Sequence, residues 1–386
     1  MNSNFKMLAK TLYGFEPILA KELRNLGAGH VKEGVRNVTF EGDTGFLYKA
    51  NLNLRTALRI LRPLATFKVF NEKQLYRQVH QIDWPSIFDI DKTFAIDTTM
   101  HSEIFKNSMF VSLKAKDALV DRFRKEVRKR PNVNSHDPDL RINIHLQENN
   151  CTVSLDSSGH SLHQRGYRIA TNIAPINEVL AAGLLLMSGW DGRTHFLDPM
   201  CGSGTFMIEA AMIACNIPAN VNRESFAFQH WLDFDETLYH KIIAASLNRT
   251  REFHYKILGY DKAPSAVRKA QENIESANLS EYIAVERKDF FTTEKTVEGK
   301  LHMVFNPPYG ERLNIEMEKF YKKLGDTLKQ GYANTDAWLV TANLEALKHV
   351  GLRPSRKIKV FNGQLESRLV RYEMYEGSKK GKFKSS

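Results

Sequence analysis

One short stretch limits the possible folds of this chain more than any other: an apolar strand that passes through a small-residue turn into an apolar helix. Residues 195–197 are followed by Asp198, and the turn that comes next, residues 199–205, reads Pro-Met-Cys-Gly-Ser-Gly-Thr. Residues 206–214 have the composition of a buried helix. The two glycines allow a ligand close to the backbone, and the helix start offers unpaired N–H groups. The stretch therefore predicts the opening unit of a nucleotide-type α/β site.

Two well-known motifs do not fit this turn. A phosphate loop needs a Lys after its last glycine, which this turn lacks, and Met207 stands where a dinucleotide fingerprint has its third glycine. A small-residue turn after a strand is also common in α/β proteins without any ligand. A second motif is needed before the turn indicates a function.

The second motif is Asn306-Pro-Pro-Tyr309, which follows another apolar, strand-like run at residues 303–305. Consecutive prolines donate no backbone N–H and hold the chain extended. Their carbonyls and the Asn306 amide can accept both N–H bonds of an exocyclic amine, while the Tyr309 ring can stack on a flat base. A proline-stiffened loop is the alternative, but the pairing with the turn at 198–205 favours chemistry on a base.

Together the two motifs resemble the class I S-adenosylmethionine-dependent methyltransferases, in the branch that modifies amino groups of bases. The resemblance implies S-adenosylmethionine as the cofactor and acids at three successive strand ends, the second of which takes the ribose hydroxyls. The implied cofactor-binding residues are Asp198, Pro199, Cys201, Gly202, Ser203, Gly204, Thr205, Asp261, Asp289, Phe290, Ala174, Ile176 and Glu178. The implied catalytic residues are Asn306, Pro307, Pro308 and Tyr309.

The rest of the C-terminal half fits an α/β sheet. An insertion at residues 223–251, expected to be helical and to pack on the core, separates the first strand unit from the second strand, which ends at Asp261. Asn362-Gly363 lies between two alternating runs, which predicts a hairpin and an antiparallel last strand.

Composition limits the partners and the cellular setting. The net charge of +11 and the pI near 9.3 favour a polyanionic partner. The three cysteines show no metal-ligand spacing, so neither a metal site nor a disulfide framework is expected. No apolar run reaches the length of a transmembrane helix, and the N-terminus does not look like a signal segment. These features predict a soluble cytoplasmic protein.

The N-terminal half divides into two blocks. Residues 5–65 suggest a small α/β unit: a helix over 15–26 capped by Gly27, strands near 38–40, a turn at 43–45 and a second helix over 48–61. Residues 66–157 contain a helix in which Ala115, Leu119, Phe123 and Val127 share one face, and most residues of the opposite face are Lys or Arg. A solvated helix face is the usual explanation of such a charge run, but the excess of cations favours phosphate contacts. The predicted RNA-binding residues are Arg122, Arg124, Lys125, Arg128, Lys129 and Arg130, with Arg312, after the Asn306 motif, as a base, phosphate or surface residue.

This basic block resembles a THUMP domain, an RNA-binding module. The segments Arg165-Gly-Tyr-Arg168 and Ala174-Pro-Ile-Asn-Glu178 are similar to the lead-in of THUMP-bearing methyltransferases, with Ile176 in place of the usual Leu. The resemblance is closest to bacterial large-subunit ribosomal RNA guanine-N2 methyltransferases and implies a single methyltransferase domain. The expected domains are a ferredoxin-like unit (1–65), the THUMP domain (66–157, or from about 45), the methyltransferase domain (158–378) and a basic tail (379–386).

The expected fold is α/β, with a Rossmann-like methyltransferase sheet after an α+β ferredoxin-like and THUMP region. The implied reaction is methyl transfer to the N2 amine of a guanosine in 23S ribosomal RNA. Three alternatives stay open: guanine-N2 methylation of tRNA, adenine-N6 methylation of nucleic acid, and a non-catalytic RNA-binding assembly factor. The THUMP-like half argues against a DNA enzyme, and the three acids with Asn306-Pro-Pro-Tyr argue against a non-catalytic factor.

Overall fold

A computed structural model of the chain describes residues 3–171, 175–308 and 316–375. These residues form two compact units. The first contains the described residues up to Thr11, together with Leu19–Leu162 and Arg223–Ser246. The second contains Leu12–Ile18, His163–Asn222 and the described residues from Leu247 onward. No helix in the described ranges is both long enough and apolar enough to cross a membrane.

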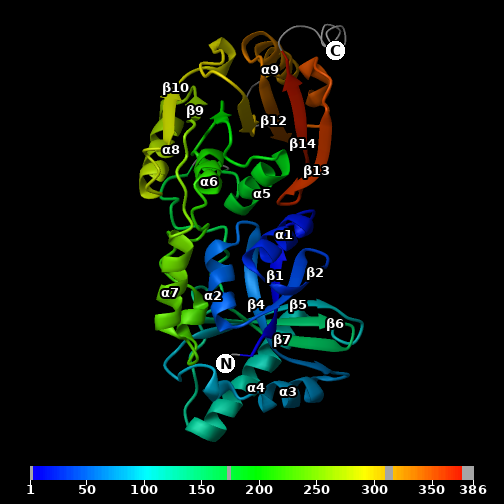
Figure 1. The fold of residues 1–386 in the computed structure, drawn as a ribbon. Coiled ribbons are helices and arrows are strands. Elements are labelled where there is room, and N and C mark those ends of the chain that lie inside the picture. Colours follow the sequence, from blue (N-terminus) through cyan, green and yellow to red (C-terminus); the bar gives the residue numbers. More distant parts are fainter. Residues whose placement is uncertain (1–2, 172–174, 309–315, 376–386) are drawn as a thin grey trace. The chain divides into compact units, whose positions relative to one another are not determined.

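The first unit is built on a seven-stranded sheet with the order β2-β3-β1-β4-β7-β6-β5 (Figure 1). Its strands are β1 (Phe5–Thr11), β2 (Gly29–Glu33), β3 (Asn37–Gly42), β4 (Ala57–Lys68), β5 (Phe94–His101), β6 (Leu140–Gln147) and β7 (Asn150–Asp156). Its helices are α2 (Thr44–Asn53), α3 (Glu72–Gln81) and α4 (Ser108–Val127), together with all but the first three residues of α1 (Glu16–Leu26) and all but the last residue of α7 (Glu236–Leu247). All neighbouring strands are antiparallel except β5 and β6.

The expected helix over residues 48–61 is wrong in its second half. Helix α2 begins earlier and ends at Asn53, and the side chain of Asp43, assigned to a turn, accepts a hydrogen bond from the N–H of Phe46 and caps the helix. Residues from Ala57 onward form β4, the central strand, which pairs with β1 on one side and β7 on the other. Hydrogen bonds to two distant strands outweigh the helical spacing of a few apolar residues.

The insertion after Asn222 packs differently from the expectation. Instead of covering the catalytic core, Arg223–Ser246 belongs to the first unit. The Phe228 ring stacks on Tyr48 of α2 with centroids 4.5 Å apart, and the Phe228 N–H donates to the Ser157 carbonyl at 3.1 Å. Tyr239 of α7 also contacts Tyr48, at 5.8 Å. The aromatic residues of the insertion therefore complete the core of the first unit.

The second unit is a seven-stranded sheet with the order β10-β9-β8-β11-β12-β14-β13. Its strands are β8 (His195–Asp198), β9 (Ile257–Asp261), β10 (Ile283–Arg287), β11 (Leu301–Phe305), β12 (Thr335–Thr341), β13 (Arg356–Asn362) and β14 (Leu365–Met374). Its helices are α5 (Glu178–Ser188), α6 (Thr205–Ala214), α8 (Pro264–Ser276) and α9 (Met317–Gly331). The expected hairpin at Asn362-Gly363 is confirmed, because Asn362 pairs with Leu365 and β14 runs antiparallel to β12.

Hydrophobic cores cover both faces of this sheet. Phe196 and Val304 point into the core shared with α5, α6 and α8, whereas their neighbours Leu197 and Phe305 point into the core shared with α9. This alternation explains why the parallel strands read as continuous apolar runs in the sequence. The expected α/β fold class, with an antiparallel last strand, is confirmed.

Because Gly325 in α9 has no side chain, the backbone of Val350 can lie closer to this helix than any other residue type would allow. A Cβ added there would lie 1.7 Å from the backbone carbonyl oxygen of Val350. We expect Gly325→Ala to lower the free energy of unfolding by about 1–3 kcal/mol, because backbone cannot move aside as a side chain can. Chemical denaturation measures the loss. Asp326→Ala, at the exposed neighbouring position, should change stability little. Equal stability of the two variants would contradict the steric argument.

Candidate active site

The predicted strand-end residues meet at the carboxyl edge of the second sheet. Strand β8 lies between β9 and β11, with β10 beyond the first and β12 beyond the second, and all five strands are parallel. After β8 the chain adds β9 and β10 on one side of this strand and then β11 and β12 on its other side. Open α/β sheets bind ligands at the strand where the order reverses in this way. Asp198 ends β8 at this point.

The turn after Asp198 brings its small residues against the end of β9. Gly202 and Gly204 have φ values of +54° and +87°, which favour glycine, and Gly204 precedes α6. The Cys201 N–H donates to the carbonyl of Tyr260 at 2.9 Å. Cys201 itself is buried, with its Cβ 3.4 Å from where a Cβ on Gly259 would lie. The predicted residues Pro199, Cys201, Gly202, Ser203, Gly204 and Thr205 therefore form one tight loop at the start of α6.

Asp261 at the end of β9 is held by two backbone groups. Its Oδ2 accepts from the N–H of Gly202 at 3.1 Å, and its Oδ1 accepts from the N–H of Ala263 at 2.9 Å. Each carboxylate oxygen can accept a further hydrogen bond, because an ionised carboxylate has about four acceptor positions. The group can therefore take two hydroxyls of a ligand while it also holds the turn.

Asp198 is an acid in an environment that disfavours its charge. Its side chain is almost fully buried and accepts a hydrogen bond from the Met200 N–H at 3.2 Å. Burial raises the pKa of Asp198 to about 8; the Met200 N–H opposes this rise, and the nearby charge of Asp261 adds to it. A cationic ligand at this place would favour the ionised form.

The third acid and the aromatic residue after it differ in exposure. Asp289 is exposed and starts a 3₁₀ turn, Phe290–Thr292, accepting from the Phe291 N–H at 3.1 Å. Phe290 is only 2% exposed, and its ring packs against Phe305 and Tyr332. Phe290 therefore supports this turn from the core, and its predicted role in cofactor binding stays a prediction.

The lead-in segment is tied to the turn by Arg168, whose central role was not predicted. Arg168 pairs with Glu178 at 2.5 Å, and its Nη2 donates to the carbonyl of Ile176 at 3.1 Å. The same guanidinium donates to Ser203 at 3.1 Å and Thr205 at 2.8 Å. One side chain thus joins the predicted residues Ile176 and Glu178 to the start of α6. The Arg-Gly-Tyr-Arg motif is the sequence signal that contains this residue.

A buried asparagine of α8 holds the same region and was missed. The Asn273 Oδ1 accepts from the N–H groups of Ile169 and Ala170 at 2.9 and 3.0 Å. Its Nδ2 donates to the carbonyls of Ala170 and Ser203 at 2.8 and 3.0 Å. All four hydrogen bonds of the amide are thereby made. A sequence signal did exist, because Asn273 falls within the otherwise apolar face formed by Ala266, Ala270 and Ile274.

Asn306 follows β11 directly and lies beside the turn. Met303 pairs with Leu197, so Asn306 lies about two residues beyond the level of Asp198 on the neighbouring strand. Strand geometry gives roughly 8 Å between the two Cα positions. Asn306 and Pro308 are half-buried and Pro307 is buried. The other predicted residues of this region, Ala174, Tyr309 and Arg312, lie outside the described residues.

The predicted RNA-binding helix in the first unit is α4. Ala115, Leu119 and Phe123 are buried as expected, whereas Val127, at its last position, is 37% exposed. Arg122 pairs with Asp83 and Glu126, and Arg124 pairs with Asp121. The other predicted residues, Lys125, Arg128, Lys129 and Arg130, are exposed and have no ion pair within the described ranges.

The described residues contain no group of three or more His, Cys, Asp or Glu side chains that could hold a metal ion. Cys151, Cys201 and Cys215 are all buried free thiols.

The raised pKa of Asp198 predicts how stability depends on pH. An unfolded Asp titrates near pH 4, so between about pH 4 and 8 the folded state binds one more proton than the unfolded state. We expect the free energy of unfolding of the cofactor-free protein to fall as pH rises through this window. Asp198→Asn should flatten that slope in urea denaturation at pH 5 to 8, while Asp289→Asn, at an exposed acid, should not. A wild-type slope in Asp198→Asn would contradict the assignment.

Comparison with known protein families identifies the same parts. Residues 165–371 match the RMKL-like methyltransferase domain, residues 70–156 the THUMP domain and residues 6–61 the RlmL ferredoxin-like domain. A putative RNA methyltransferase of Synechocystis sp. is 38% identical over 366 residues, which are 94% of this chain and 95% of that protein. A ribosomal RNA large subunit methyltransferase K/L of Shewanella amazonensis is 39% identical over 97% of this chain. The chain spans about half of that relative, 54% of its length.

Solved structures of similar proteins share the whole architecture. A putative methyltransferase crystallised as a complex with SAH (S-adenosylhomocysteine) is 28% identical, with a TM-score of 0.87 over 98% of this chain and all of that one. A predicted N6-adenine-specific DNA methylase from Listeria monocytogenes is 26% identical, with a TM-score of 0.86 over 96% of this chain and 97% of that one. With the strand-end acids and the small-residue turn, these matches show that the chain belongs to the RMKL-like methyltransferases with a THUMP domain, whose cofactor is S-adenosylmethionine.

Proposed function

We propose that this protein methylates the exocyclic N2 amine of a guanosine in 23S ribosomal RNA, in the cytoplasm. The observation that carries the proposal is the position of Asn306 and Pro307 at the end of β11, directly beside the β8 turn. An amine acceptor and a cofactor turn on neighbouring strands are the two parts that such a transfer needs.

The residues at this edge fit S-adenosylmethionine. Asp261 has acceptor capacity for the two ribose hydroxyls, and Gly202 and Gly204, both at positive φ, present no side chain to a ligand. Asp198 would lie near the methionine end, where the cofactor is cationic. Asp289 would accept from the adenine amine, and Arg168, with Glu178 and Ile176, would hold the turn in place. When bound, the cofactor supplies an electrophilic methyl group on sulfur.

The catalytic residues would act on the amine. Asn306 and the Pro307 carbonyl would accept its two N–H bonds and hold the nitrogen lone pair in line with the methyl group. These acceptors would stabilise the positive charge that develops on the amine nitrogen during the transfer. The proton then leaves to solvent, so no residue is needed as a strong base. Tyr309 would stack on the target base, which must leave its helix to reach the site.

The choice of ribosomal RNA rests on the relatives. The relative from Shewanella amazonensis is named as a ribosomal RNA large subunit methyltransferase, and the THUMP domain is an RNA-binding module. The guanine N2 assignment comes from the resemblance of the lead-in segment and the THUMP region. The structural neighbour from Listeria monocytogenes, predicted to be an adenine-specific DNA methylase, shares the architecture and makes adenine N6 the alternative to test.

The deciding assay transfers a labelled methyl group from S-adenosylmethionine to unmodified 23S ribosomal RNA, which is then digested to nucleosides. We expect the label in N2-methylguanosine. Label in N6-methyladenosine would overturn the assignment of guanine as the target base, and label in tRNA alone would overturn ribosomal RNA as the substrate. No label in any nucleic acid would favour a non-catalytic factor.

Asn306→Ala tests the catalytic assignment. We expect kcat to fall about a hundredfold or more, as for other groups that stabilise developing charge, while cofactor affinity stays unchanged. Single-turnover methyl transfer and calorimetric titration with S-adenosylmethionine measure the two quantities. Full activity of the variant would defeat the proposed role of Asn306.

Asp261→Ala tests the cofactor assignment. Loss of two charge-assisted hydrogen bonds should weaken S-adenosylmethionine binding by about 1.5–3 kcal/mol for each bond. Glu286→Ala, at an exposed acid of β10 paired with Lys288, is the matched control and should bind normally. If both variants bind as tightly as wild type, the ribose role of Asp261 is wrong.

A further inference from the structure

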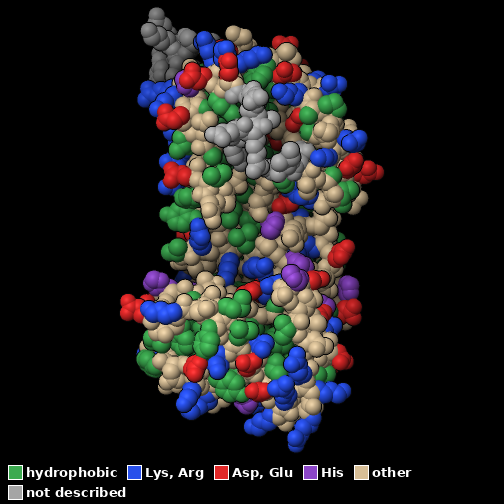
Figure 2. Space-filling model, turned by 180° about the vertical axis from the view of Figure 1, so that it is seen from behind, with side chains coloured by type: hydrophobic (Ala, Val, Ile, Leu, Met, Phe, Trp, Pro, Cys, Tyr) green, Lys and Arg blue, Asp and Glu red, His purple; other side chains and the backbone are tan. Residues whose placement is uncertain are grey.

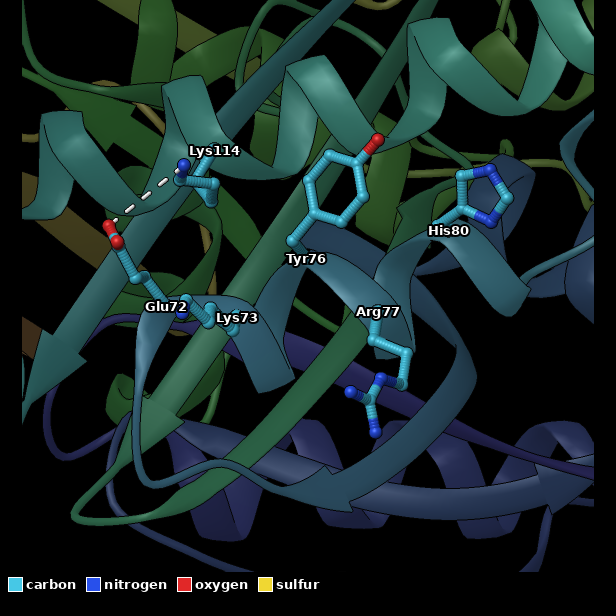
Figure 3. A pocket seen from close by; sticks show the side chains of 6 residues that line it. All are labelled: Glu72, Lys73, Tyr76, Arg77, His80 and Lys114. Carbon is cyan, nitrogen blue, oxygen red and sulfur yellow. Dashed lines mark ion pairs between the residues drawn. The ribbon is translucent and has the colours of Figure 1, made fainter.

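A groove between α3 and α4 of the first unit combines aromatic and cationic side chains. It contains two adjoining cavities of about 340 and 480 Å³, which share Tyr76 and Lys114. Figure 3 shows the residues that line the first cavity. Glu72, Lys73, Arg77 and His80 line the first, and residues of α4, with Arg130 and Val133 beyond its end, line the second. Each cavity is within the size range of small-ligand sites.

Helix α3 presents a stripe of aromatic and basic residues to this groove. Leu75 and Val79 are buried, which leaves Lys73, Tyr76, Arg77 and His80 on the opposite, solvent-accessible side. The Tyr76 and His80 rings stack with their centroids 5.9 Å apart and their planes 23° apart. Figure 3 shows both rings projecting from α3 toward α4. They form a half-buried aromatic platform, one helical turn long.

The Tyr76 ring is held in place from the other helix. Its hydroxyl donates to Oδ2 of Asp121 on α4 at 2.7 Å. Burial, the hydrogen bond to Asp121 and the charge of that carboxylate raise the pKa of Tyr76 to about 12, so the hydroxyl stays a neutral donor at physiological pH. A platform that is ordered before a ligand arrives loses little side-chain entropy on binding.

The charges of the groove leave a positive excess. Three of its cations are neutralised: Lys114 by Glu72 at 3.9 Å, Lys116 by Asp117 at 2.8 Å and Arg124 by Asp121 at 3.1 Å. The remaining lining cations, Lys73, Arg77 and Arg130, are exposed and make no ion pair with any described residue. Figure 2 shows Lys and Arg side chains gathered at the end of this unit where Figure 1 places α3 and α4.

We propose that this groove binds one unpaired nucleotide of the RNA substrate. The base stacks on the Tyr76–His80 platform, and the adjoining phosphates lie beside Lys73, Arg77 and Arg130. Stacking on an aromatic ring accepts any base, so this contact captures an unpaired strand rather than a sequence. The inference rests on the proposed RNA substrate and places the main contact on α3, where no RNA-binding residue was predicted from the sequence.

The platform is tested with a fluorescein-labelled, single-stranded RNA of about twelve nucleotides and the full-length chain. Tyr76→Ala should weaken binding between about fivefold and a hundredfold, whereas Tyr76→Phe, which keeps the ring and loses only its hydrogen bond to Asp121, should lose far less affinity. Thermal unfolding shows whether each variant is folded. Ultraviolet cross-linking to wild type should label the peptide containing Glu72–Gln81. Wild-type affinity in Tyr76→Ala, or cross-links confined to α4, would overturn the proposal.

The phosphate-binding role of the cations is tested by salt dependence. Lys73→Ala with Arg77→Ala should reduce the slope of log affinity against log salt by about 0.7 for each phosphate that these side chains neutralise in the wild type. The matched control, Lys21→Ala with Lys32→Ala, removes the same charge from exposed positions of the first unit outside the groove and should change the slope less. An equal effect of the two double variants would mean that the cations act only by general electrostatic attraction, and it would overturn the proposal that the groove binds the RNA.

Kinetic measurements distinguish an error in the proposed RNA-binding groove from an error in the proposed function. At saturating 23S ribosomal RNA the Tyr76 and Lys73–Arg77 variants should keep wild-type kcat and cofactor affinity, with KM for RNA raised. Unchanged KM with normal methyl transfer would reject the groove alone. Normal binding of the short RNA with no methyl transfer to ribosomal RNA would reject the proposed substrate alone.

Discussion

The active site depends on keeping one short turn open while its backbone is held from several sides. The turn after Asp198 must be narrow and free of bulky side chains so that a ligand can reach it. A loop of this kind has no hydrogen-bond ladder of its own to keep its shape. The structure supplies the missing constraints from three separate segments: Asp261 from β9, Arg168 from the lead-in and Asn273 from α8.

These constraints also explain how the site can be both rigid and charged. Asp261 and Arg168 are each satisfied by several partners, so neither is a buried charge without compensation. Asp198 is different, because its only described hydrogen bond comes from the Met200 N–H and burial raises its pKa. The site therefore places a buried acid with a raised pKa one strand away from an acid whose two oxygens each accept from a backbone N–H, an arrangement suited to a ligand that is cationic at one end and hydroxylated at the other.

The first unit uses charge in a different way. On α4 several arginines and lysines are paired with acids of α4 itself, of α3 or of the segment just after α3, and the cations without such partners lie on α3, in the last turn of α4 and past its end. A count of cations along one helix therefore overstates the charge of that face. The distribution of pairs, rather than the number of cations, determines where a polyanion is most strongly attracted.

Much of the fold and the site could be predicted from local patterns in the sequence. The strands that end in Asp198 and Asp261, the glycine turn, the Asn362-Gly363 hairpin and the buried face of α4 follow from side-chain periodicity and turn chemistry, which act over a few residues. Other features required the tertiary structure because their partners are distant in the chain. Residues 57–61 form a strand because they pair with β1 and β7, and Phe228 and Tyr239 pack on Tyr48. Asn273 bonds to residues about 70 and 100 positions earlier in the chain. The sequence by itself determined which segments end in acids and turns; only the tertiary structure decided what holds them, since packing and hydrogen bonding depend on neighbours in space.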